Sequence, residues 1–230
     1  MLVISIDGAC RRNGKPDCVS SGGVFIQQYN EEELVATRIL SNYEIQSTNQ
    51  RGELLALLTA LSHVWSANQS TQIITDSEYI FNAMTKEWYI GWESREWKTA
   101  LYEPVKNSDL WREIIHAYRK CVDKGIDIVF YHIKGHCIPF GKVTANTLLA
   151  KDTTGLTLYN EVLKKYDITA PQKRDKLEEA NELSYKNNGF YMPYEIQRRF
   201  VAMNVMADAI ATKCVEAADS LLTRAVSNGS

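Results

Sequence analysis

The sequence lacks the features that mark several specialised classes of protein. No apolar run approaches the roughly 20 residues that a membrane-crossing helix needs, and the opening MLVISIDGAC has neither the basic segment nor the long apolar segment of a secretory signal. The five cysteines are scattered, odd in number and without a CxxC pair, which favours reduced thiols over disulfides or a zinc site. We therefore predict a cytoplasmic protein with no membrane partner.

A strong net charge is also absent. The chain of 230 residues carries a net charge of −2, whereas many nucleic-acid-binding proteins have a marked basic excess. Its 45% hydrophobic and 23% charged residues are ordinary values for a globular protein and predict neither disorder nor a membrane protein. Any nucleic-acid function must therefore be argued from particular residues.

The chain is long enough for one large domain, or for a domain of common size with an insertion. Apolar segments bounded by turn residues predict strands, and helical periodicity between them predicts helices. Strands are expected at residues 2–7, 20–28, 34–40, 71–76 and 126–133, and helices at 48–67, 77–84, 108–125 and 193–226. This order predicts an α/β fold that opens with an antiparallel meander.

Residues 138–193 differ in character from the rest of the chain. They contain three of the five prolines, many polar residues and two helix-like pieces at 156–167 and 174–186. We interpret them as a mostly helical segment inserted into a single domain that spans residues 1–230.

Four acidic residues occupy positions where their carboxylates can meet. Asp7 and Asp76 each close a predicted strand, and strand ends in α/β sheets are where catalytic groups gather. Glu53 and Asp208 lie among apolar residues of two predicted helices, so each is expected near the sheet. Clustered carboxylates repel one another unless a cation neutralises them, and such ligands suit Mg²⁺ or Mn²⁺. Each acid alone is more often a cap, a turn former or a solvated side chain, so spacing alone leaves catalysis undecided.

Several ordered fragments resemble type 1 ribonuclease H, over about residues 1–137 and 195–215. The fragments are SIDGACRRNG, STNQRGELLALLTAL, ITDSEYI, WYIGW, WKTALYEPVKNSDLW, IKGH and NVMADAIA. The resemblance implies a ribonuclease H-like fold, a five-stranded mixed sheet flanked by helices. It also implies an endonuclease that hydrolyses the RNA strand of RNA/DNA hybrids and leaves 3′-hydroxyl and 5′-phosphate ends. We expect a monomer, and the sequence identifies no protein partner for the insertion.

The motifs of the resemblance also imply the catalytic residues. Asp7, Glu53, Asp76 and Asp208 correspond to the ligands of two Mg²⁺ ions, for which Mn²⁺ can substitute. His136, in IKGH, corresponds to a loop histidine that moves protons or assists product release. The first fragment also distinguishes related enzymes, because 3′–5′ exonucleases of the same superfamily typically carry Asp-x-Glu where this chain has Asp-Gly-Ala.

Substrate contacts follow from the same resemblance. Thr48 and Asn107 correspond to positions that hold a phosphate of the DNA strand, and Asn13, Asn49 and Gln50 correspond to residues near the minor groove. Contacts of this kind recognise the shape of a hybrid without reading its bases. For Thr48, a role as a helix cap alone is an alternative.

Four tryptophans resemble those of the family's handle, a helix and loop that grip the hybrid. Trp92, Trp97 and Trp111 are expected to pack the handle, and Trp88 is the candidate for stacking on the DNA strand. Residues 86–107 carry four basic and four acidic side chains, unlike the lysine-rich handles of many members. We therefore predict weaker hybrid binding and a shallower salt dependence than a lysine-rich relative would show.

The insertion is the main departure from the family. Asp208 lies 72 residues after His136, a much longer interval than the family usually has. Asp152 is a rival fourth ligand, but Asn204 and Asp208 keep the N-x-x-A-D spacing that Asp152 breaks, so we favour Asp208. A catalytically inactive hybrid-binding or assembly module of the same fold is the alternative function, although such a module would tend to lose its acids.

Overall fold

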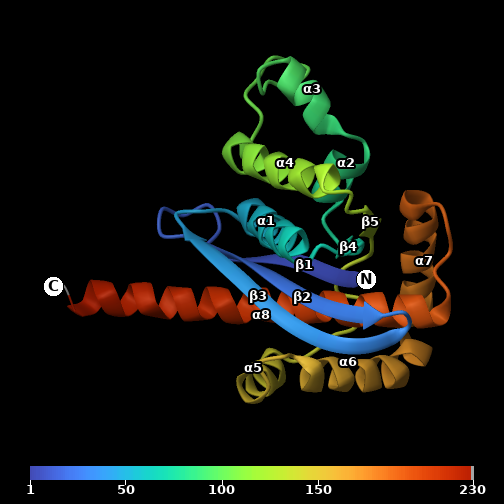
Figure 1. Cartoon of the computed structure of the whole chain (residues 1–230). Helices are drawn as coiled ribbons and strands as arrows, with labels where there is room; N and C mark the ends of the chain where they lie inside the picture. Colours follow the sequence, from blue (N-terminus) through green and yellow to red (C-terminus); the bar gives the residue numbers. More distant parts are fainter. Residues whose placement is uncertain (229–230) are drawn as a thin grey trace.

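A five-stranded mixed sheet forms the centre of the fold (Figure 1). The computed structural model describes residues 1–228. The strands are β1 (Leu2–Arg11), β2 (Val19–Asn30), β3 (Glu33–Ile45), β4 (Thr71–Thr75) and β5 (Ile128–His132). They lie in the order β3-β2-β1-β4-β5; β2 is antiparallel to β1 and β3, whereas β4 is parallel to β1 and β5. The five predicted strands and the predicted mixed sheet are confirmed. The first strand is longer than predicted, however, because β1 continues to Arg11 through its pairing with β2, so Asp7 lies within β1 and not at its end.

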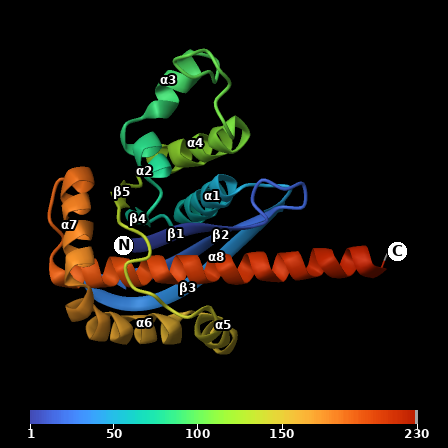
Figure 2. The same ribbon diagram turned by 180° about the vertical axis from the view of Figure 1, so that it is seen from behind.

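Helices cover both faces of this sheet (Figures 1 and 2). One face carries α1 (Asn49–Ala67), on which α4 (Ser108–Asp123) packs, and α2 (Glu78–Thr85) and α3 (Trp88–Ser94) lead from β4 to α4. The other face carries the long α8 (Tyr194–Asn228). No helix in the described part of the chain is long and apolar enough to cross a membrane.

The segment between β5 and α8 is helical. It contains α5 (Lys142–Lys151), α6 (Leu156–Thr169), a short 3₁₀ helix (Ala170–Lys173) and α7 (Arg174–Asn188). In both views α6 runs alongside α8, whereas α7 stands at the side of the sheet near β5. The two predicted helical pieces are confirmed as α6 and α7, and α5 adds a helix that the sequence did not predict.

Local signals set the ends of two predicted helices. Thr48 caps α1 through its side chain, which accepts a hydrogen bond from the Arg51 backbone nitrogen at 3.4 Å. Gly125 follows α4 with a φ of +79°, a left-handed conformation that glycine adopts without strain, and its N–H donates to Val122.

Aromatic packing stabilises the handle, which spans residues 86–107, and no helical periodicity of the sequence marks it. Its helix α3 has only seven residues and includes Gly91, so the sequence did not predict it. Trp92 packs against Trp97 and Trp111 at ring centroid distances of 6.2 and 5.3 Å. These three rings are buried, as predicted, whereas Trp88 is 38% exposed.

Candidate active site

Asp7 and Asp76 lie side by side where the ladder between the neighbouring strands β1 and β4 ends. Ile6 of β1 is paired with Thr75 of the parallel strand β4, so the residue that follows each is a neighbour of the other. Side chains alternate between the faces of a strand, and Ile74 packs in the core beneath α8. Asp7 and Asp76 are therefore expected on the α8 face, and both are partly buried.

Glycine brings α1 close enough to add a third carboxylate. Gly8 and Gly22 are opposite each other in β1 and β2, and a Cβ at Gly8 would stand 2.5 Å from the Glu53 backbone nitrogen. No other residue fits such an approach without displacing α1. Ser77 then donates a hydrogen bond to Glu53 Oε2 at 2.5 Å, and Asn49 donates to Oε1 at 3.2 Å.

A second glycine brings α8 to the other face. Gly23 is paired with Asp7, and a Cβ at Gly23 would overlap backbone atoms of Ala207 and Ala211 in α8. This close approach carries Asp208, the residue after Ala207, toward the carboxylate of Asp7. The sequence predicted both acids, but the contact between β2 and α8 explains why they meet.

The carboxylates feel one another's charge. Burial raises the pKa of Asp7 well above its usual range, and the charges of Asp76, Asp208 and Glu53 raise it further. One hydrogen bond acts in the opposite direction, because the Gly8 N–H donates to Asp7 Oδ1 at 2.7 Å. The structure thus brings together the four acids that the sequence singled out.

Asp76 and Glu53 share this environment. Burial raises the pKa of Glu53, although the Ser77 hydrogen bond lowers it. Burial also raises the pKa of Asp76, against the charge of His136 and the nearby amide of Asn204, which lower it. The Asn204 Nδ2 atom makes no hydrogen bond of ordinary geometry, so its effect on Asp76 is that of proximity.

His136 stays at the site despite the insertion that follows it. Its side chain is exposed, and its backbone has a left-handed φ of 54°. The preceding Gly135 lies against Asp76, because a Cβ there would overlap the carboxylate oxygen Oδ2. His136 also lines a cavity of about 370 Å³ with Asp208 and with Lys142 of the inserted segment.

Asp152, the rival ligand, has a different role. Its two carboxylate oxygens accept hydrogen bonds from the backbone and hydroxyl groups of Thr154 and Thr157, at the start of α6. These bonds hold its pKa far below the usual range. Its carboxylate is therefore already occupied, and it is not among the charges that act on Asp7.

The donor set fits divalent cations. Four carboxylates supply hard oxygen ligands of the kind that Mg²⁺ and Mn²⁺ prefer, and their mutual repulsion would be relieved by positive charge. Within residues 1–228, no three acidic, histidine or cysteine side chains converge on a ready-made coordination sphere. The fit therefore rests on the chemistry and the charge of the four acids.

The proposed substrate residues lie at separate places on the surface. Asn13 and Gln50 are exposed, in the β1–β2 loop and the first turn of α1. Asn107 is partly buried with a φ of 56° immediately before α4, and it makes no side-chain cap bond. Thr48 is used as a helix cap and Asn49 binds Glu53, so each has a structural partner already.

Two polar residues near Asp76 were missed by sequence analysis. Ser77 orients Glu53, as described above. His132, at the end of β5, is 4% exposed, and its Nε2 lies 3.2 Å from the backbone oxygen of Asp76. No motif marks His132, because the partners that orient it come from α7, far along the chain.

Comparisons with known proteins show which sequences this chain resembles. A family model described as RNase H matches residues 1–152. Ribonuclease H from Roseobacter denitrificans is 36% identical over 130 residues, which are 56% of this chain and 80% of that protein. Ribonuclease H from Chromohalobacter salexigens is 36% identical over 147 residues, 64% of this chain and 80% of that protein.

One solved structure shows the likeness of fold. The crystal structure of LC9-RNase H1, a type 1 RNase H with the type 2 active-site motif, aligns with a TM-score of 0.50 and 24% identity. The alignment covers 59% of this chain and 63% of that chain. The family match ends at residue 152, so the position of Asp208 comes from the fold and not from that match.

Proposed function

This chain belongs to the ribonuclease H family and is an enzyme of that family, and we propose that it cuts the RNA strand of RNA/DNA hybrids internally. One observation carries the proposal: the carboxylates of Glu53, Asp76 and Asp208 all act on that of Asp7, where the ladder between β1 and β4 ends. A cluster of unneutralised acids destabilises a fold, so a functional cation is the natural reason for it.

Asp7, Glu53, Asp76 and Asp208 would hold two Mg²⁺ ions, or Mn²⁺ in their place. When bound, these ions would activate a water and stabilise the leaving 3′ oxygen of the phosphodiester. Ser77 and Asn49 keep the Glu53 carboxylate directed into the site. The exposed His136 imidazole would move a proton at the departing group or assist product release, and the products would carry 3′-hydroxyl and 5′-phosphate ends.

The hybrid would be held at the predicted surface positions. Asn13 and Gln50 expose amides for the minor groove, and Trp88 offers a partly exposed ring to the DNA strand. Asn107 supplies an amide without a capping bond for a DNA phosphate. Thr48 would bind the same DNA phosphate only by sharing its hydroxyl between the helix cap and the phosphate.

The proposal includes a cytoplasmic, monomeric enzyme whose residues 138–193 are an insertion within one domain. A single chain supplies all four carboxylates, which supports a monomer. The five cysteines are free thiols, as expected in a reducing compartment. Leu158 of α6 packs in the same core as Phe25 of β2, which supports one domain.

The decisive test uses a labelled RNA/DNA hybrid beside matched RNA/RNA and DNA/DNA duplexes, with Mg²⁺ or with EDTA. We expect internal cleavage of the RNA strand of the hybrid alone, abolished by EDTA and by Asp76→Asn. Asp152→Asn is the matched control, because it removes a carboxylate that lies outside the proposed site.

Other outcomes would identify the alternatives. A ladder of products that shorten one nucleotide at a time would indicate a 3′–5′ exonuclease. Hybrid binding without Mg²⁺-dependent cleavage would indicate an inactive binding or assembly module. Cleavage of RNA/RNA or DNA/DNA duplexes would reject the assigned substrate.

A further inference from the structure

The inserted helix α7 contacts β5, the strand that pairs with β4, although the proposed function gives α7 no task. Figures 1 and 2 show α7 standing beside β5. β5 pairs with β4, and Asp76 follows the last residue of β4. We propose that Asn187 and Asn188 of α7 act through His132 to position Asp76, which makes the insertion a working part of the metal site. This inference rests on the proposed function, because it treats Asp76 as a metal ligand.

Asn188 holds the end of β5 as a neighbouring strand would. The His132 backbone N–H donates to Asn188 Oδ1 at 2.9 Å, and Asn188 Nδ2 donates to the His132 backbone oxygen at 2.8 Å. Ser184, one turn earlier in α7, accepts a further bond from Nδ2 at 3.1 Å. Since β5 is an edge strand, these bonds satisfy backbone groups that would otherwise face solvent. His132 is thereby fixed in position.

Asn187 determines which nitrogen of His132 carries the hydrogen. The Asn187 Nδ2 atom lies 2.7 Å from His132 Nδ1, and an amide nitrogen can only donate. Nδ1 therefore accepts, and in a neutral ring Nε2 carries the hydrogen and donates it to the Asp76 backbone oxygen at 3.2 Å. If the amide oxygen of Asn187 faced Nδ1 instead, a neutral ring would turn a lone pair toward that carbonyl. Only the first arrangement makes both contacts attractive.

Asp76 needs such support because it lies beyond the end of its strand. The ladder between β4 and β5 ends with the pair Thr75 and His132, so no further ladder bond holds Asp76. The charge of Asp7 repels its carboxylate, and Gly135 packs directly against it. The bond from His132 to the Asp76 backbone oxygen resists displacement of the carboxylate by this repulsion.

His132 has no other visible task. The ring is buried and packs against Phe81 at a centroid distance of 5.5 Å, which limits its rotation. Neither of its nitrogens faces the exposed cavity lined by His136 and Asp208. We therefore describe His132 as a positioning residue and Asn187 as the residue that selects its tautomer.

Paired substitutions separate the two nitrogens of the ring. The amide of glutamine reaches the place of Nε2 and can donate to Asp76, whereas the shorter asparagine reaches only the place of Nδ1. Mn²⁺ affinity is measured by calorimetry on the full chain without nucleic acid, alongside kcat and KM for hybrid cleavage. Glu178→Gln is the matched control on α7, because Glu178 is exposed and its ion pair is with Arg174 of the same helix.

We expect His132→Asn to weaken Mn²⁺ binding about tenfold or more, the usual effect of losing a partner that orients a metal ligand. The value of kcat should fall while KM stays near that of the parent. His132→Gln should restore most of the affinity, Asn187→Ala should fall between the two, and Glu178→Gln should match the parent.

Equal losses of Mn²⁺ affinity in His132→Asn and His132→Gln would overturn the proposal, because a packing role alone predicts no rescue. Unchanged affinity in all variants would also overturn it. If His132→Asn does not fold, Asn187→Ala at the partly buried surface of α7 carries the test. If the parent and the variants rank in Mn²⁺ affinity as predicted but the parent leaves hybrids uncut, the proposed function is rejected and this inference stands.

Discussion

Carboxylate pKa values are shifted in opposite directions in two regions of this protein: the candidate site, whose four acids are here called the acidic edge, and the surface beside α1. At the edge, burial raises the pKa values of Asp7, Glu53 and Asp76, and neighbouring carboxylates raise those of Asp7 and Glu53 further. Beside α1, Arg51 donates to both Glu44 and Asp109, at 2.6 to 2.9 Å, and lowers the pKa of each.

No ion pair with lysine or arginine is found for the four edge acids within the described residues. The same chain pairs other acids with arginine, including Glu93 with Arg119 and Asp167 with Arg198. The chain therefore has arginines that pair with acids elsewhere, whereas the acids of the candidate site have no such partner within the described residues. The lack of basic partners supports the proposed cation site.

The largest expected effect separates Asp208 from Asp152. Asp208→Asn should lower hybrid cleavage by at least about 100-fold, because the site would lose a charged ligand. Asp152→Asn should leave cleavage close to the parent, because this carboxylate is bound by Thr154 and Thr157. Initial rates at saturating Mg²⁺ give the comparison, and a larger loss in Asp152→Asn would reverse the assignment.

Removal of a charge should have opposite effects on stability in the two regions. Asp7→Asn should raise the free energy of unfolding of the metal-free protein by about 1 kcal/mol at pH 7, because it relieves repulsion. Urea denaturation in EDTA measures this, and Mg²⁺ should remove the advantage. A destabilised Asp7→Asn protein would show that the edge acids do not repel one another.

Arg51→Met should instead destabilise the protein, because it removes the ion pairs of Arg51 with Glu44 and Asp109. The loss should be only about 0.5 to 1 kcal/mol, because both ion pairs are partly exposed to solvent. The loss follows from leaving Glu44 and Asp109 unpaired. Urea denaturation of this variant under the same conditions completes the comparison. Stability equal to that of the parent would mean that solvent screens both ion pairs.

The two variants should also differ in their dependence on pH. Because the pKa values of the edge acids are raised in the folded state, their protonated forms stabilise the folded protein. This stabilisation is fully present below about pH 4, the usual carboxylate pKa, and is lost as pH rises through the raised pKa values. The advantage of Asp7→Asn should therefore grow with pH. The lowered pKa values of Glu44 and Asp109 act oppositely, so the defect of Arg51→Met should fade as pH falls below about 4. Relative to the parent, the free energy of unfolding of Asp7→Asn should therefore rise between about pH 3 and 7, whereas that of Arg51→Met should fall. Denaturation series in which both variants gained stability over the parent, or both lost it, as pH rises would contradict this.

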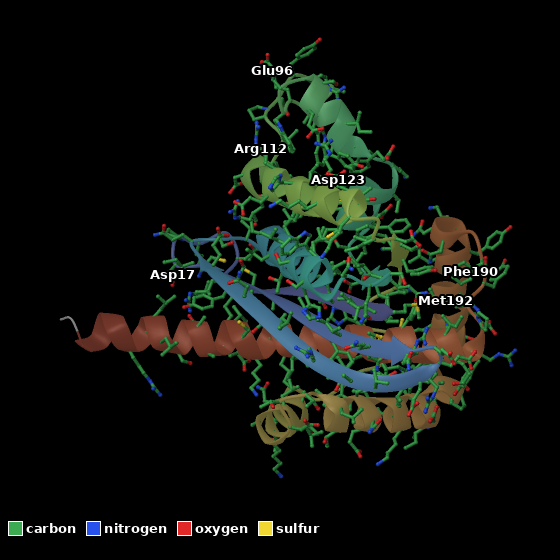
Figure 3. All side chains as sticks on the ribbon, viewed as in Figure 1. Asp17, Glu96, Arg112, Asp123, Phe190 and Met192 are labelled. Carbon is green, nitrogen blue, oxygen red and sulfur yellow. The ribbon has the colours of Figure 1, made fainter. Side chains whose placement is uncertain are left out.

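The smallest expected effect concerns the handle, where acids and bases are balanced. Glu96 lies at its outer tip, as Figure 3 shows, while Arg112 of α4 is engaged with the Trp97 ring at 4.5 Å. Glu96→Lys should strengthen hybrid binding and steepen the slope of log K against log salt by up to about 1. Glu178→Lys on α7 is the control, and an equal change there would indicate a non-specific charge effect.

Much of the fold was predictable because it depends on local patterns. Apolar segments bounded by turn residues marked β1, β2 and β5, and Thr48 and Gly125 marked helix ends. The handle helix α3 was not predictable, since seven residues around Gly91 are stabilised by contacts of Trp92 with rings elsewhere in the chain.

The sequence by itself determined which residues are candidates for the chemistry: two acids in strand motifs, two acids on apolar helix faces, and one histidine. Only the tertiary structure decided how these groups meet. Gly23 admits α8 to the sheet beside Asp7, and α7 supplies the amides that orient His132 behind Asp76. Such contacts join residues far apart in the chain, and no local pattern of side chains encodes the distance between them.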